Sequence, residues 1–246
     1  MKTPERITYI KNWIFDYCKS MPNEAKSLVV GISGGIDSSV TSTLCALTGK
    51  KTIVLTMPIN QVKNQHELSL KHLEWLKGKF NNVESYLINL DKVYKFFQDT
   101  LGKSDNKHGF ANSRARLRMA TLYQVASSNN GIVVGTGNKV EDFGVGFYTK
   151  YGDGGVDISP IADCTKTQVW DMGKYLEILD EIIKAEPTDG LWDDGRTDTN
   201  QLGMTYQELE KAMNEVNSKN HRKYLEIRKR NLHKMIPIPV CKMKNE

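Results

Sequence analysis

Residues 27–39 read SLVVGISGGIDSS, and this stretch decides which fold the chain can adopt. SLVVGI is a short apolar run bounded by turn residues, which is typical of a fully buried strand in a parallel sheet. The glycine-rich turn that follows leads into SSVTSTLCAL, which reads as a helix. In an open parallel α/β sheet, ligands bind at the carboxyl ends of the strands. We therefore expect an α/β protein with a ligand at this turn.

Strands and helices alternate along the rest of the chain. Three more strands are predicted at TIVLTM, VESYLI and GIVVGT. Helices are predicted at about residues 3–20, 64–80, 91–100, 111–127 and 165–179, and around TYQELEKAMNEV and HRKYLEIRKRNL. Repeated strand and helix units with buried strands predict a doubly wound parallel sheet flanked by helices on both faces.

Two long segments lack this alternation. Residues 137–160 are rich in glycine, and residues 186–204 contain EPTDGLWDDGRTD. We predict irregular structure in both, and both are candidates for loops that order over a ligand and exclude water. No domain boundary is visible, so residues 1–246 are expected to form a single domain.

Composition limits the classes of protein to consider. A hydrophobic content of 39% suits a buried core of ordinary size, and no apolar run is long enough to span a bilayer. The N-terminus has no apolar signal core, and the four cysteines lie far apart without a CxxC pair. We therefore expect a cytoplasmic protein with reduced thiols. The net charge of +5 is a mild preference for anionic partners and does not distinguish a nucleotide from a nucleic acid.

The chemistry of the quoted turn suits an anion. Its glycines let the backbone approach phosphates closely, its serines add hydroxyl groups, and the following helix presents its positive N-terminus. The chain contains neither the GxxxxGK[ST] string of a Walker loop nor a GxGxxG dinucleotide fingerprint at this turn. On this stretch alone, a tight turn without any ligand is an equal alternative.

The string SGGIDS at residues 33–38 resembles the pyrophosphate-binding loop of the ATP pyrophosphatases. These enzymes cleave ATP between its α- and β-phosphates, and the resemblance implies their adenine nucleotide alpha hydrolase-like fold. A carboxylate beside a phosphate cradle is repelled by its ligand unless a hard cation such as Mg²⁺ stands between them. The resemblance therefore also gives Asp37 a purpose.

Further motifs narrow the resemblance to one family. They are VVGTGNKVE at 133–141, GFYTKYGDGGVDISPI at 146–161, EPT at 186–188 and HK at 233–234. In this order, and over nearly the whole chain, they look like the motifs of the ammonia-dependent NAD synthetases. The resemblance implies a ligase in which the nicotinate carboxylate of deamido-NAD attacks the α-phosphate of ATP, and ammonia then displaces AMP to give NAD. It also implies a homodimer with substrate sites near the interface.

Matched motif by motif, the resemblance implies roles for individual residues. For ATP these are Gly31, Ile32, Ser33, Gly34, Gly35, Ile36, Asp37, Ser38, Thr136, Lys166 and Thr188. For deamido-NAD they are Arg116, Lys150, Asp157, His233 and Lys234. Asp37 and Glu141 are expected to hold Mg²⁺, and Asp37 and Lys166 are expected to act in catalysis.

Two assignments stay open or depend on the family. The chain has one residue more between Glu141 and Lys150 than the shorter pattern of many bacterial members, so either Glu141 or Asp142 faces the metal. Helical geometry puts Arg114 and Arg118 on one face and Arg116 on nearly the opposite face. The resemblance selects Arg116, and the other two arginines are expected to be surface or ion-pairing residues.

Other functions compete with this interpretation. GMP synthetase and the tRNA-thiolating enzymes share SGGxDS, but the chain shows no glutaminase-like domain and no paired cysteines for sulfur transfer. A nucleotide-sensing module would bind ATP and release it uncleaved. The basic segment KNHRKYLEIRKRNLHK at 219–234 could bind nucleic acid, although a charged helix face is the better interpretation. We expect ATP, deamido-NAD and ammonia as partners, and neither nucleic acid nor a membrane.

Overall fold

The computed structural model describes residues 1–61, 63–103, 106–188, 190 and 197–243. Within them, the chain forms a four-stranded parallel sheet in the order β3-β2-β1-β4. The strands are β1 (Ser27–Gly31), β2 (Lys51–Thr56), β3 (Val83–Leu87) and β4 (Gly131–Val133). All four lie where the apolar runs predict them, and β1 and β2 are buried almost throughout, as strands covered on both faces must be.

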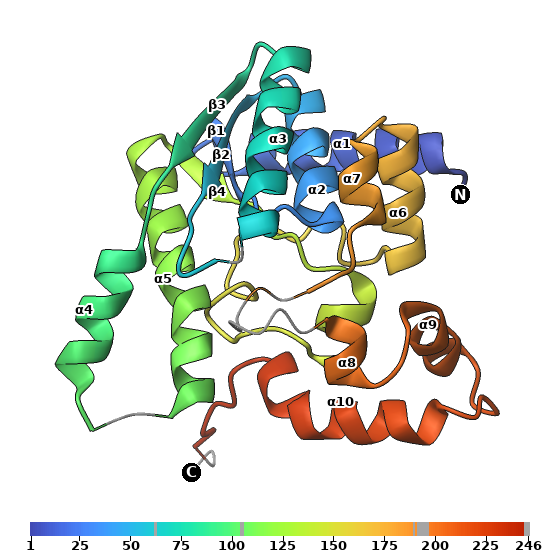
Figure 1. Ribbon diagram of the computed structural model, residues 1–246. Helices are drawn as coiled ribbons and strands as arrows, with labels where there is room; N and C mark the ends of the chain where they lie inside the picture. Colours follow the sequence, from blue (N-terminus) through green and yellow to red (C-terminus); the bar gives the residue numbers. More distant parts are fainter. Residues whose placement is uncertain (62, 104–105, 189, 191–196, 244–246) are drawn as a thin grey trace.

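Helices cover both faces of this sheet (Figure 1). The helical segments are α1 (Thr3–Ser20), α2 (Ile36–Leu47), α3 (Lys63–Lys79), α4 (Asp91–Leu101), α5 (Lys107–Ser128), η1 (Lys139–Val145), α6 (Lys166–Tyr175), α7 (Asp180–Lys184), α8 (Asp198–Leu202), α9 (Tyr206–Asn214) and α10 (His221–Met235). One face packs on α1, α2, α3, α6 and α7, and the other packs on α4 and α5. The doubly wound prediction is confirmed.

A third group of buried residues lies away from the sheet. Val140 and Val145 of η1 pack there with Leu202, Tyr206 and Leu209, which come from the α8–α9 region. In Figure 1, η1 and α8–α10 lie together beyond one end of the sheet. Elements that follow β4 thus form a small helical layer facing the glycine-rich turn after β1, and this layer brings distant parts of the sequence to the same place.

Several boundaries differ from the sequence prediction for local reasons. Helix α5 begins at Lys107 rather than 111, because Asn106 Oδ1 accepts a hydrogen bond of 2.8 Å from Gly109 N and caps the helix. Helix α6 ends at Tyr175 and not near 179, since Glu177 has a left-handed backbone with φ of 58°. Residues 139–145 of the stretch predicted to be irregular form the π-helix η1.

The second irregular prediction, over 186–204, falls partly outside the described residues, which exclude 189 and 191–196. Its C-terminal part is helical. Thr197 caps α8 by accepting a hydrogen bond of 3.2 Å from Asn200 N. In the described part of the chain, no helix combines the length and apolar character that crossing a bilayer requires.

Helix α2 packs against α3 through polar groups. Ser42 Oγ lies 2.9 Å from His72 Nε2, and both side chains are completely buried. The imidazole stacks on Trp75 at 5.5 Å between ring centroids. Burial lowers the pKa of His72 to about 4, because a charged imidazolium in this position has lost its water. His72 is therefore neutral in the folded protein at neutral pH.

This burial predicts a loss of stability in mild acid. In the unfolded chain His72 takes up a proton below a pKa of about 6.5, while the folded chain resists it down to about 4. The full stability is present above pH 6.5, and about 3 kcal/mol is lost as the pH falls to 4. Urea unfolding of the wild type and of His72→Gln at several pH values measures the difference. His233→Gln, at an exposed position, should leave the acid dependence unchanged.

Candidate active site

The turn between β1 and α2 is shaped by a glycine that no other residue can replace without strain. Gly34 has φ of 92°, and a Cβ built on it would lie 2.4 Å from the backbone oxygen of Gln65. The turn therefore packs directly against the start of α3. Gly35 caps α2 without offering a side-chain acceptor, so the N-terminal turn of the helix is not covered by its own cap.

Serine hydroxyls hold the turn from inside. Ser33 Oγ accepts a hydrogen bond of 3.2 Å from Gly35 N and lies 3.2 Å from Ser38 Oγ. Ser38 Oγ and Ser39 Oγ each donate to Gly35 O at 3.0 Å. The loop is thus ordered by hydrogen bonds among its own residues. Backbone N–H groups at a helix N-terminus together with such hydroxyls are a common arrangement for binding phosphate.

A buried ion cluster lies beside this turn. Lys166 Nζ is 2.6 Å from Asp37 Oδ2 and 2.9 Å from Glu141 Oε1. The lysine side chain is 3% exposed, and the two carboxylate side chains are 16% and 15% exposed. Two carboxylates share one ammonium, so the cluster carries one net negative charge when all three groups are ionised.

Each member of the cluster comes from a different element whose start is fixed by a cap. Asp37 is in the first turn of α2, directly after β1. Lys166 opens α6, where Thr165 Oγ1 accepts from Gln168 N and the Gln168 side chain accepts from Thr165 N. This capping box fixes the start of α6 close to the predicted helix start at about residue 165.

Asn138 connects the Asp37 carboxylate to the backbone of η1 at Glu141. Its Nδ2 donates to Asp37 Oδ1 at 3.0 Å, while its Oδ1 accepts from Val140 N and Glu141 N at 3.0 and 3.1 Å. It therefore caps η1 and orients Asp37 with one completely buried amide. Sequence reasoning missed this residue, although an asparagine three positions before a glutamate is a recognisable helix-start pattern.

Burial and the neighbouring charges together set the pKa of each group in the cluster. Burial raises the pKa of Asp37, and the nearby Glu141 adds to this effect. Burial acts in the same direction on Glu141, but Lys166 and the Tyr206 hydroxyl hold the pKa of Glu141 below its usual range. Burial would lower the pKa of Lys166, and the two carboxylates outweigh it and raise that pKa. The ammonium form of Lys166 is therefore stabilised by its two carboxylate partners.

The donor set fits Mg²⁺. Asp37 and Glu141 are hard oxygen ligands, and they already converge on one positive charge. Among the described residues, no group of three or more metal-ligating side chains forms. Two protein carboxylates suit an ion that keeps several waters and takes further ligands from nucleotide phosphates.

The structure distinguishes Glu141 from Asp142. Glu141 shares Lys166 with Asp37, whereas the carboxylate of Asp142 lies against Gly137, where an added Cβ would come within 1.8 Å of Oδ2. Burial raises the pKa of Asp142 well above its usual range. Both carboxylates lie in the π-helix η1, and π-helical turns are frequent at functional sites.

Side chains of α10 stabilise the end of η1. Arg228 Nη1 donates to the backbone oxygens of Phe143 and Gly144, the latter at 2.7 Å. Asn231 Nδ2 donates to Val145 O at 2.8 Å. These carbonyl groups lie at the C-terminal end of η1, where the helix has no further backbone N–H groups to donate to them. The basic segment at 219–234 thus has a structural use within the chain.

The residues predicted to hold the nicotinate nucleotide lie around the end of η1 and along α5. Arg116 is exposed, and its Nε donates to Lys150 O at 3.2 Å. Lys234 Nζ donates to Tyr148 O at 2.5 Å, so α10 reaches the same loop. His233, its neighbour, is exposed. The structure therefore brings Arg116, Lys150 and Lys234 to one loop.

Asp157 has partners of its own. Its Oδ1 accepts from the Tyr123 hydroxyl at 2.9 Å, and its Oδ2 accepts from Val133 N at 2.7 Å. The carboxylate thus ties α5 to β4. This arrangement also raises the pKa of Tyr123 to about 12, through burial and the adjacent carboxylate.

The remaining two predicted ATP residues lie on either side of the turn. Thr136 is in the loop after β4, two positions before Asn138. Thr188 Oγ1 accepts from Gly190 N at 3.2 Å. A Cβ on Gly190 would contact the Gln65 side chain at 3.4 Å, which places this segment beside the start of α3, next to Gly34.

The other arginines of α5 correct one expectation. Arg114 is buried, with its guanidinium 5.1 Å from the centre of the Tyr94 ring, so it does not lie at the surface, and the alternative of an ion-pairing residue stays open. Arg118 Nε donates to Met57 O at 2.9 Å, and burial lowers the pKa of Arg118 to about 10. Both point inward because α5 lies across the sheet, and Arg116 faces outward as helical geometry predicts.

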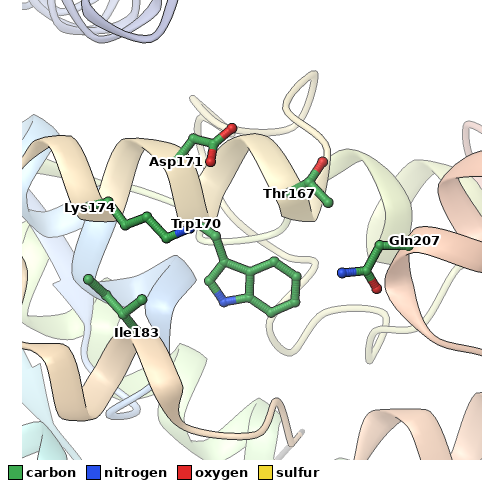
Figure 2. Close-up of a pocket in the computed structure, with 6 residues that line it drawn as sticks. All are labelled: Thr167, Trp170, Asp171, Lys174, Ile183 and Gln207. Carbon is green, nitrogen blue, oxygen red and sulfur yellow. The ribbon is translucent and has the colours of Figure 1, made fainter.

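A separate pocket lies on the outer side of α6 (Figure 2). Its volume is about 330 Å³, and none of its lining residues was predicted to be a site residue; they are Thr167, Trp170, Asp171, Lys174, Ile183 and Gln207. The indole of Trp170 forms its centre in Figure 2. Trp170 also packs edge-on against Tyr206 at 5.9 Å, so this pocket backs onto the carboxylate cluster.

The geometry of the turn predicts that alanine substitutions at its two central glycines lower the free energy of unfolding by different amounts. Gly34→Ala forces a side chain onto a left-handed backbone and against Gln65 O, and we expect a loss of about 2 kcal/mol or more in the free energy of unfolding. Gly35→Ala is the control, since its nearest contact would be Ser33 Oγ at 3.4 Å. Urea unfolding of both variants tests this, and equal losses would contradict it.

Comparison with known proteins places the chain in a family. The NAD synthase family model matches residues 6–245. The NH(3)-dependent NAD(+) synthetase of Carboxydothermus hydrogenoformans is 36% identical over 214 residues, which covers 84% of this chain and 83% of that protein. Among solved structures, NMN synthetase from Francisella tularensis has a TM-score of 0.91 and 33% identity, with coverage of 99% of this chain and 100% of that chain.

A more distant structure agrees in fold. NH3-dependent NAD synthetase from Campylobacter jejuni has a TM-score of 0.79 and 23% identity, covering 98% of this chain and 100% of that chain. Its parallel sheet flanked by helices is the ATP pyrophosphatase fold that the turn sequence implies. From the family match, the coverage of its relatives and the shared fold, we conclude that this chain belongs to the NAD synthase family, whose members are ligases that form carbon–nitrogen bonds.

Proposed function

We propose that the chain catalyses the ATP-dependent amidation of deamido-NAD by ammonia, giving NAD, AMP and pyrophosphate. The observation that carries this proposal is the convergence of Asp37, Glu141 and Lys166 beside the turn after β1. Such a cluster suits the transfer of a nucleotide, and its lysine and carboxylates are engaged in ion pairs with one another. Catalysis then consists of positioning and of neutralising charge.

The reaction has two displacements. A carboxylate oxygen of the nicotinate attacks the α-phosphorus of ATP, and the bond to the bridging oxygen of pyrophosphate breaks. Ammonia then attacks the carboxyl carbon of the adenylate, AMP leaves with the bonding electrons, and the ammonia nitrogen loses a proton to give the amide. We assign the phosphates to the turn of residues 31–38, with Thr136 and Thr188 at its sides.

One Mg²⁺ held by Asp37 and Glu141 would supply positive charge to the phosphates. Both carboxylates already face a common cation, the ammonium of Lys166. If Asp37 and Glu141 held such an ion, the ammonium of Lys166 would be available to phosphate oxygens. The lysine side chain is buried next to the turn, and phosphate oxygens would replace the carboxylates as its anionic partners.

The nicotinate nucleotide is assigned to the loop that Arg116, Lys150 and Lys234 share. Three cations at one loop suit a ligand with phosphate and carboxylate groups. His233 extends the group on the exposed side of α10. Asp157 supports the loop by holding Val133 N and the Tyr123 hydroxyl, which fixes α5 against β4.

A second acceptor has a specific observation in its favour. The structure with a TM-score of 0.91 is that of an NMN synthetase, and its name refers to a mononucleotide product. Nicotinate mononucleotide carries the same reacting carboxylate as deamido-NAD. The chemistry at Asp37, Glu141 and Lys166 is the same for both, so the acceptor must be determined by experiment.

Product analysis tests the function. Mg-ATP, ammonium and either deamido-NAD or nicotinate mononucleotide are supplied in parallel, and amide, AMP and pyrophosphate are measured together. We expect equimolar amide and AMP, with the higher kcat/KM for deamido-NAD. A higher value for the mononucleotide would select the second acceptor, and ATP left uncleaved with both would refute the amidation. Asp37→Ala should lower kcat by at least about a hundredfold because the metal loses a ligand.

We further propose that two copies of the chain associate through α4. Val93, Phe96 and Leu101 of α4 are exposed, and so are Tyr86 and Leu87 at the end of the edge strand β3. Phe96 is 74% exposed. Exposed apolar side chains on a helix at the edge of the molecule, as α4 is in Figure 1, favour burial in an interface.

Light scattering after size exclusion tests this interface. Phe96→Asp places a charge in the centre of the apolar face, and we expect it to convert a dimer into a monomer. Tyr9→Asp on α1 is the matched control, because Tyr9 is also an exposed aromatic residue, at 62%. A Phe96→Asp variant that remains dimeric would contradict the assignment of α4.

The remaining parts of the proposal concern the setting of the reaction. We propose that residues 1–246 act as one catalytic domain, which the family match over residues 6–245 supports. We also propose a cytoplasmic location. Cys18, Cys45 and Cys164 are buried free thiols, which suits a reducing compartment.

A further inference from the structure

Tyr206 lies against the carboxylate cluster, although no sequence motif identified it as a site residue. It opens α9, where Thr205 and Glu208 form a capping box. The side chain is 3% exposed. Trp170 packs edge-on against the ring at 5.9 Å, and Lys166 Nζ lies 4.7 Å from the ring centre. The ring is thus held in a fixed place by aromatic packing and by a cation.

The phenol hydroxyl contacts two carboxylates. It lies within hydrogen-bond distance of Glu141 Oε1, and it is 2.7 Å from Asp198 Oδ2. Glu141 Oε1 is the same oxygen that accepts from Lys166 Nζ at 2.9 Å. If Lys166 turns to a phosphate, the Tyr206 hydroxyl stays as a donor on that oxygen, because the buried ring has no room to follow the lysine.

Asp198 holds the hydroxyl from the other side. Its side chain is buried, with the residue 4% exposed. Its backbone N donates to Pro187 O at 3.0 Å, directly before Thr188. A phenol carries one proton and donates to one carboxylate at a time. Glu141 and Asp198 therefore compete for the one proton, and ring packing holds the phenol oxygen within reach of both carboxylates.

We propose that Tyr206 is a positioning residue for Glu141: its hydroxyl orients the Glu141 carboxylate toward the divalent cation. This rests on the proposed function, in which Asp37 and Glu141 hold Mg²⁺. Partners behind a metal ligand commonly fix its orientation, and their loss weakens metal binding about 10- to 100-fold. Tyr206 acts through Glu141 and does not itself touch a phosphate or the reacting atoms.

Metal binding tests the proposal without turnover. Mn²⁺ is titrated by electron paramagnetic resonance into the protein with an ATP analogue that has a methylene bridge between its α- and β-phosphates. Tyr206→Phe keeps the ring, its contact with Trp170 and its contact with Lys166, and removes only the hydroxyl. We expect Mn²⁺ to bind about tenfold more weakly, while the affinity for the analogue in the presence of EDTA is unchanged.

Tyr224→Phe is the matched control. Tyr224 is also buried, at 8% exposure, in the same hydrophobic group as Tyr206. We expect this variant to bind Mn²⁺ like the wild type. Thermal unfolding shows whether each variant is folded. Equal Mn²⁺ affinity in the wild type and in Tyr206→Phe would overturn the proposal, and so would an equal loss in Tyr224→Phe.

A second variant tests the role of the Tyr206 hydroxyl if Tyr206→Phe does not fold. Asp198→Asn removes the competing carboxylate and leaves the Tyr206 hydroxyl free to donate to Glu141. We expect its Mn²⁺ affinity to stay within about twofold of the wild type. A tenfold loss in Asp198→Asn would show that the hydroxyl does not position Glu141.

Asp37→Ala separates failure of this inference from failure of the proposed function. If Asp37→Ala binds Mn²⁺ as the wild type does, the metal does not use this cluster, and both are overturned. If Asp37→Ala loses Mn²⁺ binding while Tyr206→Phe keeps it, the proposed metal ligands stand and the role of Tyr206 is refuted.

Discussion

The candidate site depends on one buried ammonium group shared by two carboxylates. Lys166 neutralises repulsion between Asp37 and Glu141, which otherwise could not both remain ionised so close together in a poorly solvated place. Removing one partner of such a group is expensive, since the others stay buried with unbalanced charge. The cluster therefore ties α2, η1 and α6 together while leaving one negative charge for a stronger cation to satisfy.

Parallel topology explains why these elements meet. Strand β1 lies between β2 and β4, so the loops after β1 and β4 emerge next to each other at one end of the sheet. Asp37 follows the first of these strands, and Glu141 follows the second. Asn138 then fixes the distance between them with a single amide group. The helical layer of α8–α10 closes the outer side of the cluster.

Much of this was predictable from sequence, and the exceptions have physical causes. The buried strand β1 is recognisable in the sequence from its apolar composition. The meeting of Asp37 and Glu141 follows from the order of the strands in the sheet. Lys166 begins a helix that follows no strand, so periodicity could not place it, and only family resemblance selected it. The partnership of Tyr206 with Glu141 spans 65 residues and depends on tertiary packing. Boundaries such as the end of α6 depended on one backbone angle at Glu177.

The π-helix η1 has a consequence for how relatives are compared. In an α-helix, inserting one residue turns every later side chain by roughly 100°, which would move a ligand from the interior to the surface. A π-helix such as η1 has wider turns, and one added residue in such a turn need not rotate the side chains that follow it. Aligning the segment without a gap to a relative that is one residue shorter would shift the residues on one side of the difference by one position. Residue roles transferred by sequence alone would then be one position out of register.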